Sequence, residues 1–200
     1  MNDRSPEHIR PLLVRIDRLM AERERVLVAI DGGSASGKTT LGALLQSIYG
    51  CPVFHMDDFF LRPEQRTPER FSEPGGNVDR ERFLSEVLLP LREGKTVDYR
   101  RFDCKTFTIA SPRRIEPGRL NIIEGAYAMH PDLAPYYDLT VFLAVSAEKQ
   151  RERILKRNAP AQAELFFDRW IPFEQRYFAA LNVPERCDLT IFLDDQTSVP

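Results

Sequence analysis

The hydrophobic residues of this chain fall into five short runs, separated by segments in which apolar residues recur at helical spacing. The runs are rich in β-branched and aliphatic side chains and therefore predict buried strands. These predicted strands cover residues 26–30, 51–55, 120–125, 139–145 and 189–193. Helical periodicity predicts helices over residues 9–20, 41–48, 80–91, 147–158 and 166–181, the last interrupted at Pro172. Strands that alternate with helices predict an α/β fold, in which helices flank a parallel five-stranded sheet.

Two stretches between the predicted strands and helices lack a clear hydrophobic period. Residues 61–79 are rich in proline, glycine and charge and predict a long loop, and loops of that length usually bind a ligand or close over one. Residues 95–118 alternate weakly and predict a small hairpin-like insertion. Because no internal repeat is present, the simplest organisation is one domain over residues 1–200, with an N-terminal helix within 1–25 and a lid over 147–163.

The N-terminal helix is expected to begin at Ser5, with Pro6 in its first turn. Its apolar residues form one face, and its polar face carries both acidic residues and arginines. A basic polar face would favour binding to a membrane surface, whereas this mixed face favours packing against the outside of the domain.

Size and composition restrict the classes of function. The chain has 200 residues, of which 42% are hydrophobic and 29% charged, as is ordinary for a soluble globular domain. The formal net charge of -2 disfavours a general nucleic-acid or membrane-surface binder, and no apolar run reaches membrane-spanning length. Cys51, Cys104 and Cys187 form no C-x-x-C pair, so neither a zinc site nor a disulfide framework is predicted. Since the first residues also lack a signal-peptide pattern, we expect a cytoplasmic protein.

A glycine-rich turn follows the first predicted strand. Residues 32–39 fit G-x-x-x-x-G-K-[ST], the pattern of a phosphate-binding loop, and the strand before and helix after them supply the context that this loop requires. Glycines let backbone N–H groups approach phosphate oxygens, and the following helix adds the positive end of its dipole. Lys38 can reach the β- and γ-phosphates, and the Thr39 hydroxyl can bind Mg²⁺. The alternative, a glycine turn beside a surface lysine, does not explain the flanking elements.

The residues expected to hold the nucleotide are Gly32, Gly33, Ser34, Ala35, Ser36, Gly37, Lys38, Thr39 and Thr40.

Carboxylates follow two of the predicted strands. Asp57 and Asp58 come directly after the second strand, and Glu124 lies at the end of the third. In an open parallel sheet, ligands bind beyond the carboxyl ends of the strands, so these acids should face the phosphate site. Adjacent side chains diverge from extended backbone, and one aspartate is therefore expected to serve structure. Glu124 can hold the water shell of a metal ion or polarise a nucleophile. The alternatives are a loop cap for the aspartates and a turn residue for Glu124.

The predicted helix 147–158 carries four cations, namely Arg151, Arg153, Lys156 and Arg157. Such a run is usually a solvated face. Because this helix follows the core strand after Glu124, its position also suits a lid that clamps phosphates.

In their order and spacing these motifs resemble the uridine kinase and phosphoribulokinase-like group of P-loop kinases. Residues 31–40, 56–60, 122–125 and 172–174 carry the resemblance together with the arginine-bearing helix, and the similarity extends from about residue 26 to residue 193. The resemblance implies the three-layer P-loop NTPase fold of nucleoside and nucleotide kinases. It also implies ATP as the phosphoryl donor, Mg²⁺ and a mobile lid.

Roles for individual residues follow from the motifs together with the resemblance, which implies the role of Asp57. Asp57 would act as the base on the acceptor hydroxyl, Lys38 would hold the triphosphate, and Arg153 or Arg157 would neutralise charge on the transferred group. The expected metal-binding residues are Thr39, Asp57 and Glu124. The expected substrate contacts are Asp57, Phe60, Tyr99, Phe102 and Glu124.

The chain departs from the uridine kinase pattern mainly on the acceptor side. Residues 99–104 read Tyr-Arg-Arg-Phe-Asp-Cys and lack the histidine of uridine kinases, and residues 73–77 read Glu-Pro-Gly-Gly-Asn in place of their usual His-Pro-Asp. Residues 158–161 replace the second arginine pair of the lid. Residues 57–60 are equally similar to nicotinamide riboside kinases. The phosphate chemistry therefore transfers better than the identity of the acceptor.

The sequence thus predicts an ATP-dependent kinase that acts on a hydroxyl of a small molecule, first of all the 5′-hydroxyl of a nucleoside such as uridine or cytidine. Nicotinamide riboside, pantothenate or another small metabolite is the alternative acceptor. An ATPase or switch without an acceptor is disfavoured by the paired aspartates and the long loop. A binding protein without chemistry is disfavoured by Lys38, Thr39, Asp57 and Glu124. No nucleic-acid or membrane partner is expected, and self-association is left open.

Overall fold

Five parallel strands form the central sheet of the computed structural model, which describes residues 7–192. The strands are β1 (Val26–Gly32), β2 (Val53–His55), β7 (Leu120–Glu124), β8 (Leu139–Ala144) and β9 (Leu189–Phe192). Their order across the sheet is β2-β7-β1-β8-β9, and every neighbouring pair is parallel. The predicted sheet is therefore confirmed. β2 begins later than predicted, and residue 193, the predicted end of the last strand, lies outside the described residues.

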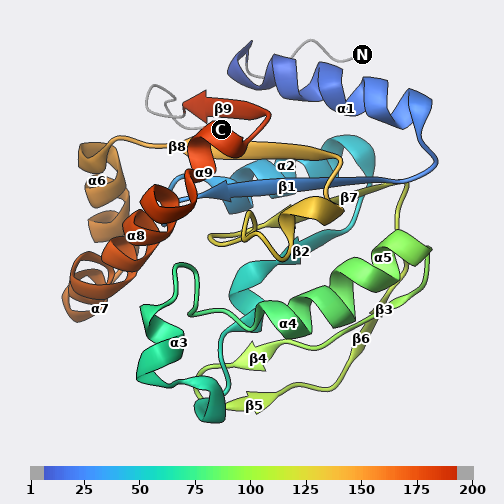
Figure 1. Ribbon diagram of the computed structural model, residues 1–200. Coiled ribbons are helices and arrows are strands. Elements are labelled where there is room, and N and C mark those ends of the chain that lie inside the picture. The colour runs from blue at the N-terminus through green and yellow to red at the C-terminus, as the bar shows by residue number, and fades with distance from the viewer. Residues whose placement is uncertain (1–6, 193–200) are drawn as a thin grey trace.

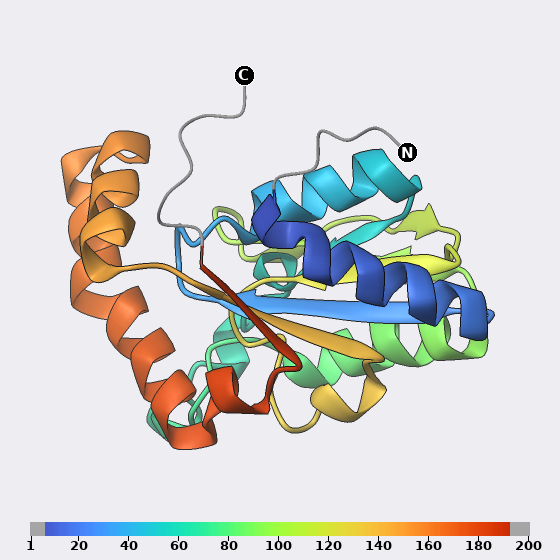
Figure 2. The same cartoon turned by 90° about the horizontal axis from the view of Figure 1, so that it is seen from above.

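Helices cover both faces of this sheet (Figure 1, Figure 2). The α-helices are α1 (Arg10–Glu22), α2 (Lys38–Tyr49), α3 (Pro68–Ser72), α4 (Arg80–Phe83), α5 (Leu89–Glu93), α6 (Ala147–Arg157), α7 (Pro160–Leu165), α8 (Ile171–Leu181) and α9 (Val183–Arg186). The 3₁₀ turns are η1 (Glu7–Ile9), η2 (Met56–Phe59), η3 (Pro63–Gln65) and η5 (Ala134–Tyr136), and the π-helical turns are η4 (Leu84–Leu88) and η6 (Phe166–Trp170). α1 and α2 pack on one face, whereas α4, α5 and α8 pack on the other.

Residues of the central strand β1 alternate between the two cores. Val26, Val28 and Ile30 pack with α1 and α2, and Leu27 and Ala29 pack with the helices of the opposite face. All of β1 is buried, as expected for a parallel strand that is covered on both sides. This two-sided burial fixes the register of the strand and therefore the position of the turn that follows it.

The apolar face of the N-terminal helix packs on the sheet, as its pattern predicted. Ile9, Leu12 and Ile16 are buried there. The predicted start at Ser5 and Pro6 lies outside the described residues. Over residues 7–192, no helix combines the length and the apolarity that crossing a membrane would require.

A π-helical turn accommodates the proline that was expected to interrupt the last long helix. The N–H of Ile171 donates to the carbonyl of Phe166, and Pro172 follows directly. Proline has no N–H and its ring crowds the preceding turn, so a wider turn relieves the conflict. The helical path therefore continues through residues 160–181. Pro90 follows the π-helical turn η4 in the same way.

Residues 61–79 differ from the prediction of an irregular loop, because they contain η3 and α3. The side chain of Thr67 accepts a hydrogen bond from the N–H of Arg70 at 3.2 Å, and Pro68 occupies the first turn of α3. A helix of five residues is too short to show a hydrophobic period, so only its cap could have revealed it. The predicted cap at Asp79 is present: its side chain accepts from the N–H of Arg82 at 3.1 Å.

Residues 95–118 form the expected hairpin-like insertion, as a bent antiparallel ribbon. It contains two ladders, β3 (Val97–Tyr99) with β6 (Arg113–Ile115), and β4 (Phe102–Asp103) with β5 (Thr108–Ile109). Figure 1 shows β4 and β5 beside the segment that carries η3 and α3.

Candidate active site

The turn between β1 and α2 is tightly folded against the sheet. Gly32 has a φ of 149°, and a Cβ at this position would lie 2.5 Å from the carbonyl oxygen of Leu143, so only glycine fits. Gly37, directly before α2, has a φ of 106°, and Ala35 has a φ of 57°. Successive turns of this kind gather backbone N–H groups into an anion-binding concavity at the N-terminus of a helix. The geometry therefore fits the phosphate-binding loop that the motif predicted.

Lys38 places its charge on this loop. Its side chain is buried, and its Nζ donates to the carbonyl of Gly33 at 2.8 Å. A backbone carbonyl binds an ammonium group less strongly than a phosphate oxygen does. This contact therefore holds Lys38 at the place where a bound polyphosphate would receive it.

Glu124 joins the loop helix to the neighbouring strand. It is buried at the end of β7, and its Oε1 accepts a hydrogen bond from the Thr39 hydroxyl at 3.1 Å. The Nδ1 of His55 lies 2.5 Å from the same oxygen. His55 and Glu124 are register partners across β2 and β7, which explains why they meet. The hydrogen bond to Glu124 raises the pKa of His55, and burial opposes it.

The Thr39–Glu124 pair has the donor chemistry of a magnesium site. Mg²⁺ in nucleotide sites usually takes one or two protein oxygens and completes its shell with phosphate oxygens and water. A hydroxyl and a carboxylate beside a phosphate-binding loop fit that requirement. His55 was not among the predicted site residues, although its place at the end of a strand, directly before the aspartates, was a usable signal.

The two adjacent aspartates have different surroundings. Asp58 is buried, and its carboxylate accepts from the hydroxyl of Tyr99 at 2.7 Å and from Nε of Arg101 at 2.8 Å. Asp57 is exposed and makes no hydrogen bond or ion pair with any described residue. Asp57 is thus the aspartate whose carboxylate remains available to a ligand.

Asp57 is open to solvent, yet protein atoms crowd it at the base of the site. This loss of hydration raises its pKa; the charge of Lys38 opposes the shift, and the charge of Glu124 adds to it. The charges of Asp57, Lys38 and Glu124 therefore act on one another. The three side chains lie close together at one end of the sheet.

Tyr99, an expected substrate contact, lies in the core. Its hydroxyl donates to Asp58 and accepts from the backbone N–H of His55 at 3.1 Å. Burial and the hydrogen bond to Asp58 raise its pKa well above the usual value. The hydroxyl of Tyr99 is thus occupied by its hydrogen bonds and holds Asp58 and the end of β2 in place. This geometry favours a structural role for Tyr99 over direct contact with an acceptor.

The two phenylalanines expected at the substrate pack against different parts of the structure. Phe60 is half-buried, with its ring centroid 6.4 Å from that of Trp170 in η6. Phe102 is buried on the ribbon, with its centroid 6.5 Å from that of Phe107. Of these two phenylalanines, Phe60 is the one that contacts the C-terminal helices.

The cationic helix α6 holds the tip of the loop. Nε2 of Gln150 donates to the carbonyl of Ser34 at 2.8 Å, and Nη1 of Arg153 donates to the carbonyl of Ala35 at 3.2 Å. Arg157 instead lies over the ring of Phe166, 5.8 Å from its centroid. Of the two arginines considered for charge neutralisation, Arg153 is the one at the loop.

Glu174 of α8 also holds the loop, and sequence reasoning assigned it no role. It is buried; its Oε1 accepts from the Ser34 hydroxyl at 2.6 Å and its Oε2 accepts from the Ser34 N–H at 2.8 Å. Burial raises its pKa, and the hydrogen bonds from Ser34 oppose the shift. Residues 172–174 carry part of the family resemblance, but the sequence could not show the contact, because Ser34 is distant from Glu174 in sequence.

Asp31 fastens the end of β1 to the same helix. This fully buried carboxylate accepts from the N–H of Gly32 at 2.6 Å, from the N–H of Met129 at 2.8 Å and from the hydroxyl of Tyr177 at 2.8 Å. Burial raises its pKa, and the three hydrogen bonds oppose that shift. Tyr177 lies one turn after Glu174, so α8 supports both the base and the tip of the loop.

The chain is similar in sequence to known proteins. The family model described as the phosphoribulokinase / uridine kinase family matches residues 27–161. Uridine kinase-like protein 4 of Arabidopsis thaliana is 28% identical over 146 residues, which are 68% of this chain and 31% of that protein. The uridine kinase of Ligilactobacillus salivarius is 26% identical over 151 residues, 70% of each chain.

The fold is also shared with solved structures. A candidate fructose transport system kinase from a Silicibacter species superimposes with a TM-score of 0.73 and 24% identity, over 93% of this chain and 99% of that one. The family match spans well over half of the chain and includes the loop, β7 and β8. The chain therefore belongs to the phosphoribulokinase and uridine kinase family of P-loop kinases.

Proposed function

We propose that this protein transfers the γ-phosphate of ATP to a hydroxyl group of a small molecule. The observation that carries the proposal is the unpaired carboxylate of Asp57, which stands beside Lys38 and Glu124 at the mouth of the loop. A kinase uses such a carboxylate to orient the acceptor hydroxyl, whereas an ATPase would have to use it to orient water.

Each residue of the site has a role in this reaction. The loop amides and Lys38 bind the triphosphate, and Lys38 exchanges the Gly33 carbonyl for phosphate oxygens. Thr39 and Glu124 would hold Mg²⁺, which would offset negative charge on the phosphates. Asp57 orients the acceptor hydroxyl and receives its proton. As that oxygen forms a bond to the γ-phosphorus, the bond from the γ-phosphorus to the bridging oxygen breaks and ADP leaves.

The surroundings of Asp57 suit a base. Its raised pKa brings it closer to neutrality than that of a free aspartate, and a base works best when its pKa is near the working pH. Positioning and charge stabilisation supply most of the rate in phosphoryl transfer. Arg153 stands at the loop tip, where it neutralises charge on the transferred group.

Several acceptors are compatible with this proposal. The resemblance to uridine kinases puts the 5′-hydroxyl of a nucleoside first, with nicotinamide riboside, pantothenate and other small metabolites behind it. With ATP as donor and no partner other than a small molecule, we expect the enzyme to act in the cytoplasm.

The experiment is a measurement of ADP formation by the purified protein with Mg²⁺ and ATP. Nucleosides, nicotinamide riboside, pantothenate and sugar phosphates are added one at a time. We expect at least one of them to raise the rate and to appear as a phosphorylated product. A rate of ATP hydrolysis that is the same with every acceptor and with none would favour the ATPase instead.

A further inference from the structure

The chain between positions 62 and 101 is rich in arginine, and almost all of this charge is paired with carboxylates within the protein. Of the eight arginines between positions 62 and 101, all of them in the described part of the chain, seven lie within 3.8 Å of a carboxylate oxygen. The pairs are Arg62 with Asp79, Arg70 with Glu81, Arg80 with Asp132, Arg82 with Asp79 and Glu86, Arg92 with Asp138, Arg100 with Glu86, and Arg101 with Asp58. The exception is Arg66.

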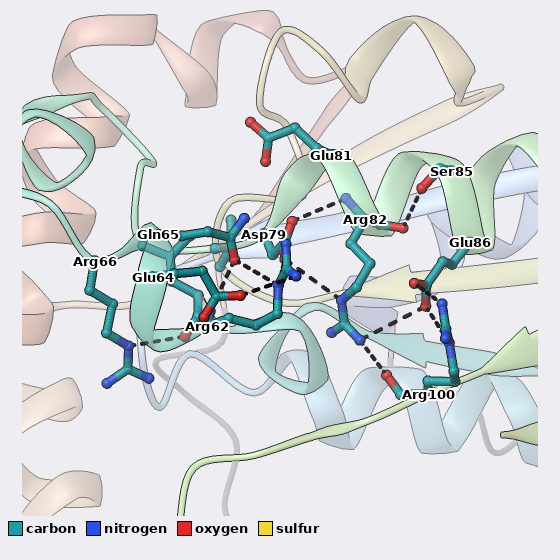
Figure 3. Close-up of polar contacts among 12 residues, drawn as sticks. Arg62, Glu64, Gln65, Arg66, Asp79, Glu81, Arg82, Ser85, Glu86 and Arg100 are labelled. Carbon is teal, nitrogen blue, oxygen red and sulfur yellow. Dashed lines mark hydrogen bonds and ion pairs between the residues drawn. The ribbon is translucent and has the colours of Figure 1, made fainter. Parts of the chain in front are cut away.

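Arg66 is held in place although no described carboxylate pairs with it. Its Nε donates to the carbonyl of Leu61 at 3.0 Å, and its guanidinium carbon lies 5.0 Å from the ring centroid of Phe107 and 5.8 Å from that of Phe102. Figure 3 shows its side chain directed away from the network of Arg62, Asp79, Arg82, Glu86 and Arg100. Arg66 is exposed, and no residue among 7–192 accepts a hydrogen bond from its two terminal nitrogens.

Contacts through the hairpin connect Arg66 to the surroundings of Asp57. Phe102, on which it stacks, follows Arg101, and Arg101 binds Asp58 next to Asp57. Cys104 of the same hairpin is close to both charges: burial raises the pKa of its thiol, the charge of Arg66 lowers it and the charge of Asp57 raises it.

Phe107 adds an apolar surface beside this guanidinium. The side chain is 49% exposed, and the residue has a φ of 57°, in the left-handed region that bulky residues seldom adopt. The exposed ring provides a flat apolar surface next to the guanidinium of Arg66.

We propose that the acceptor carries an anionic group, a carboxylate or a phosphate monoester, in addition to the hydroxyl that is phosphorylated, and that Arg66 binds this group. The inference rests on the proposed function and narrows its substrate class. A guanidinium binds carboxylate and phosphate through two parallel hydrogen bonds, and the stacking of Arg66 on two rings removes much of the entropy that such binding would otherwise cost. A plain nucleoside has no anionic group for this contact.

The test compares Arg66→Gln and Arg66→Lys with the wild type and with Arg113→Gln. Arg113 is a matched control, because it is exposed on the same insertion and has no side-chain partner among the described residues. The probes are pantothenate, a hydroxy carboxylate; ribose 5-phosphate, a sugar phosphate; and uridine, which is neutral. Each is assayed for ADP formation at saturating ATP, and for equilibrium binding in the presence of Mg²⁺ and a non-hydrolysable ATP analogue.

We expect the wild type to prefer an acidic probe to uridine, and the identity of that probe tells carboxylate from phosphate. Arg66→Gln should weaken its binding and raise its KM by about tenfold or more, with kcat and the KM for ATP retained. Arg66→Lys should recover part of the loss, and Arg113→Gln should match the wild type.

The inference is overturned if no acidic probe binds, or if Arg66→Gln binds it as the wild type does. Turnover of uridine that is indifferent to Arg66 would overturn it while leaving the kinase proposal intact. Conversely, an acidic probe that binds through Arg66 and is never phosphorylated would uphold the anion site and count against the kinase.

Discussion

The carboxylate of Glu174 accepts hydrogen bonds from both the hydroxyl and the backbone N–H of Ser34, at 2.6 and 2.8 Å. The contact joins the phosphate-binding loop to a helix that lies beyond the region of the family match. Gln150 of α6 binds the carbonyl of the same serine. The tip of the loop therefore takes its shape from the C-terminal helices as well as from its own glycines.

Replacement of Glu174 by glutamine should raise the KM for ATP by about fivefold or more, because one strong acceptor of the loop is lost and each such hydrogen bond contributes about 1 kcal/mol. The melting temperature should fall by about 2–4 °C, because the same hydrogen bond also stabilises the fold. Steady-state kinetics over a range of ATP concentrations checks this, with Glu185→Gln, an exposed neighbour on α9, as the control. A lower KM for ATP would instead mean that the charge of Glu174 repels the nucleotide more than it positions the loop.

The two adjacent aspartates should respond differently to the same change. Asp57→Asn should reduce kcat by about 100-fold or more and leave ATP binding almost unchanged, because the base is lost and the loop is not touched. Asp58→Asn should mainly lower stability, since Tyr99 and Arg101 lose their charged acceptor. Turnover numbers and unfolding midpoints of both variants test these two expectations. Normal turnover in Asp57→Asn would remove that residue from the mechanism.

Glu124→Gln should increase the Mg²⁺ concentration needed for half-maximal activity. An amide is a poorer ligand for Mg²⁺ than a carboxylate, and the Thr39 hydroxyl would keep only a neutral acceptor. Loss of the carboxylate should also return the pKa of His55 toward its usual value, because the hydrogen bond to Glu124 is what raises it. Magnesium titrations of activity and an NMR titration of His55 test the two effects. An unchanged magnesium requirement would argue against Glu124 as a metal-binding residue.

His130 should make the stability of the protein depend on pH. Burial lowers the pKa of this histidine to about 4, and the charge of Arg80 lowers it further while Asp132 opposes the shift. Because the folded-state pKa is depressed, the contribution of His130 is fully present above about pH 6.5, the unfolded value, and is lost as the pH falls toward 4. Urea unfolding at several pH values should show a steeper loss for the wild type than for His130→Gln. Parallel pH profiles would contradict the assignment.

The sheet and the loop could be predicted because their signals are local. The run from Val26 to Ile30 and the glycines around Lys38 determine a strand, a turn and a helix within one short stretch. The short helix α3 was missed because its signal is a cap rather than a period.

The acceptor side could not be predicted in the same way. The hydroxyl of Tyr99 and the side chain of Arg66 find their partners across the fold, at Asp58 and at Phe107. Whether a tyrosine faces a ligand or the core depends on where the ribbon folds back, and a single sequence does not state that.

The support of the loop by α8 has a consequence for protein engineering. A shortened chain that stops at residue 161 would retain every residue of the glycine-rich motif, and yet Ser34 and Asp31 would lose their partners Glu174 and Tyr177. The nucleotide site therefore cannot be moved to another scaffold by transferring the glycine-rich motif alone. A transplant would have to bring the distant helix with it.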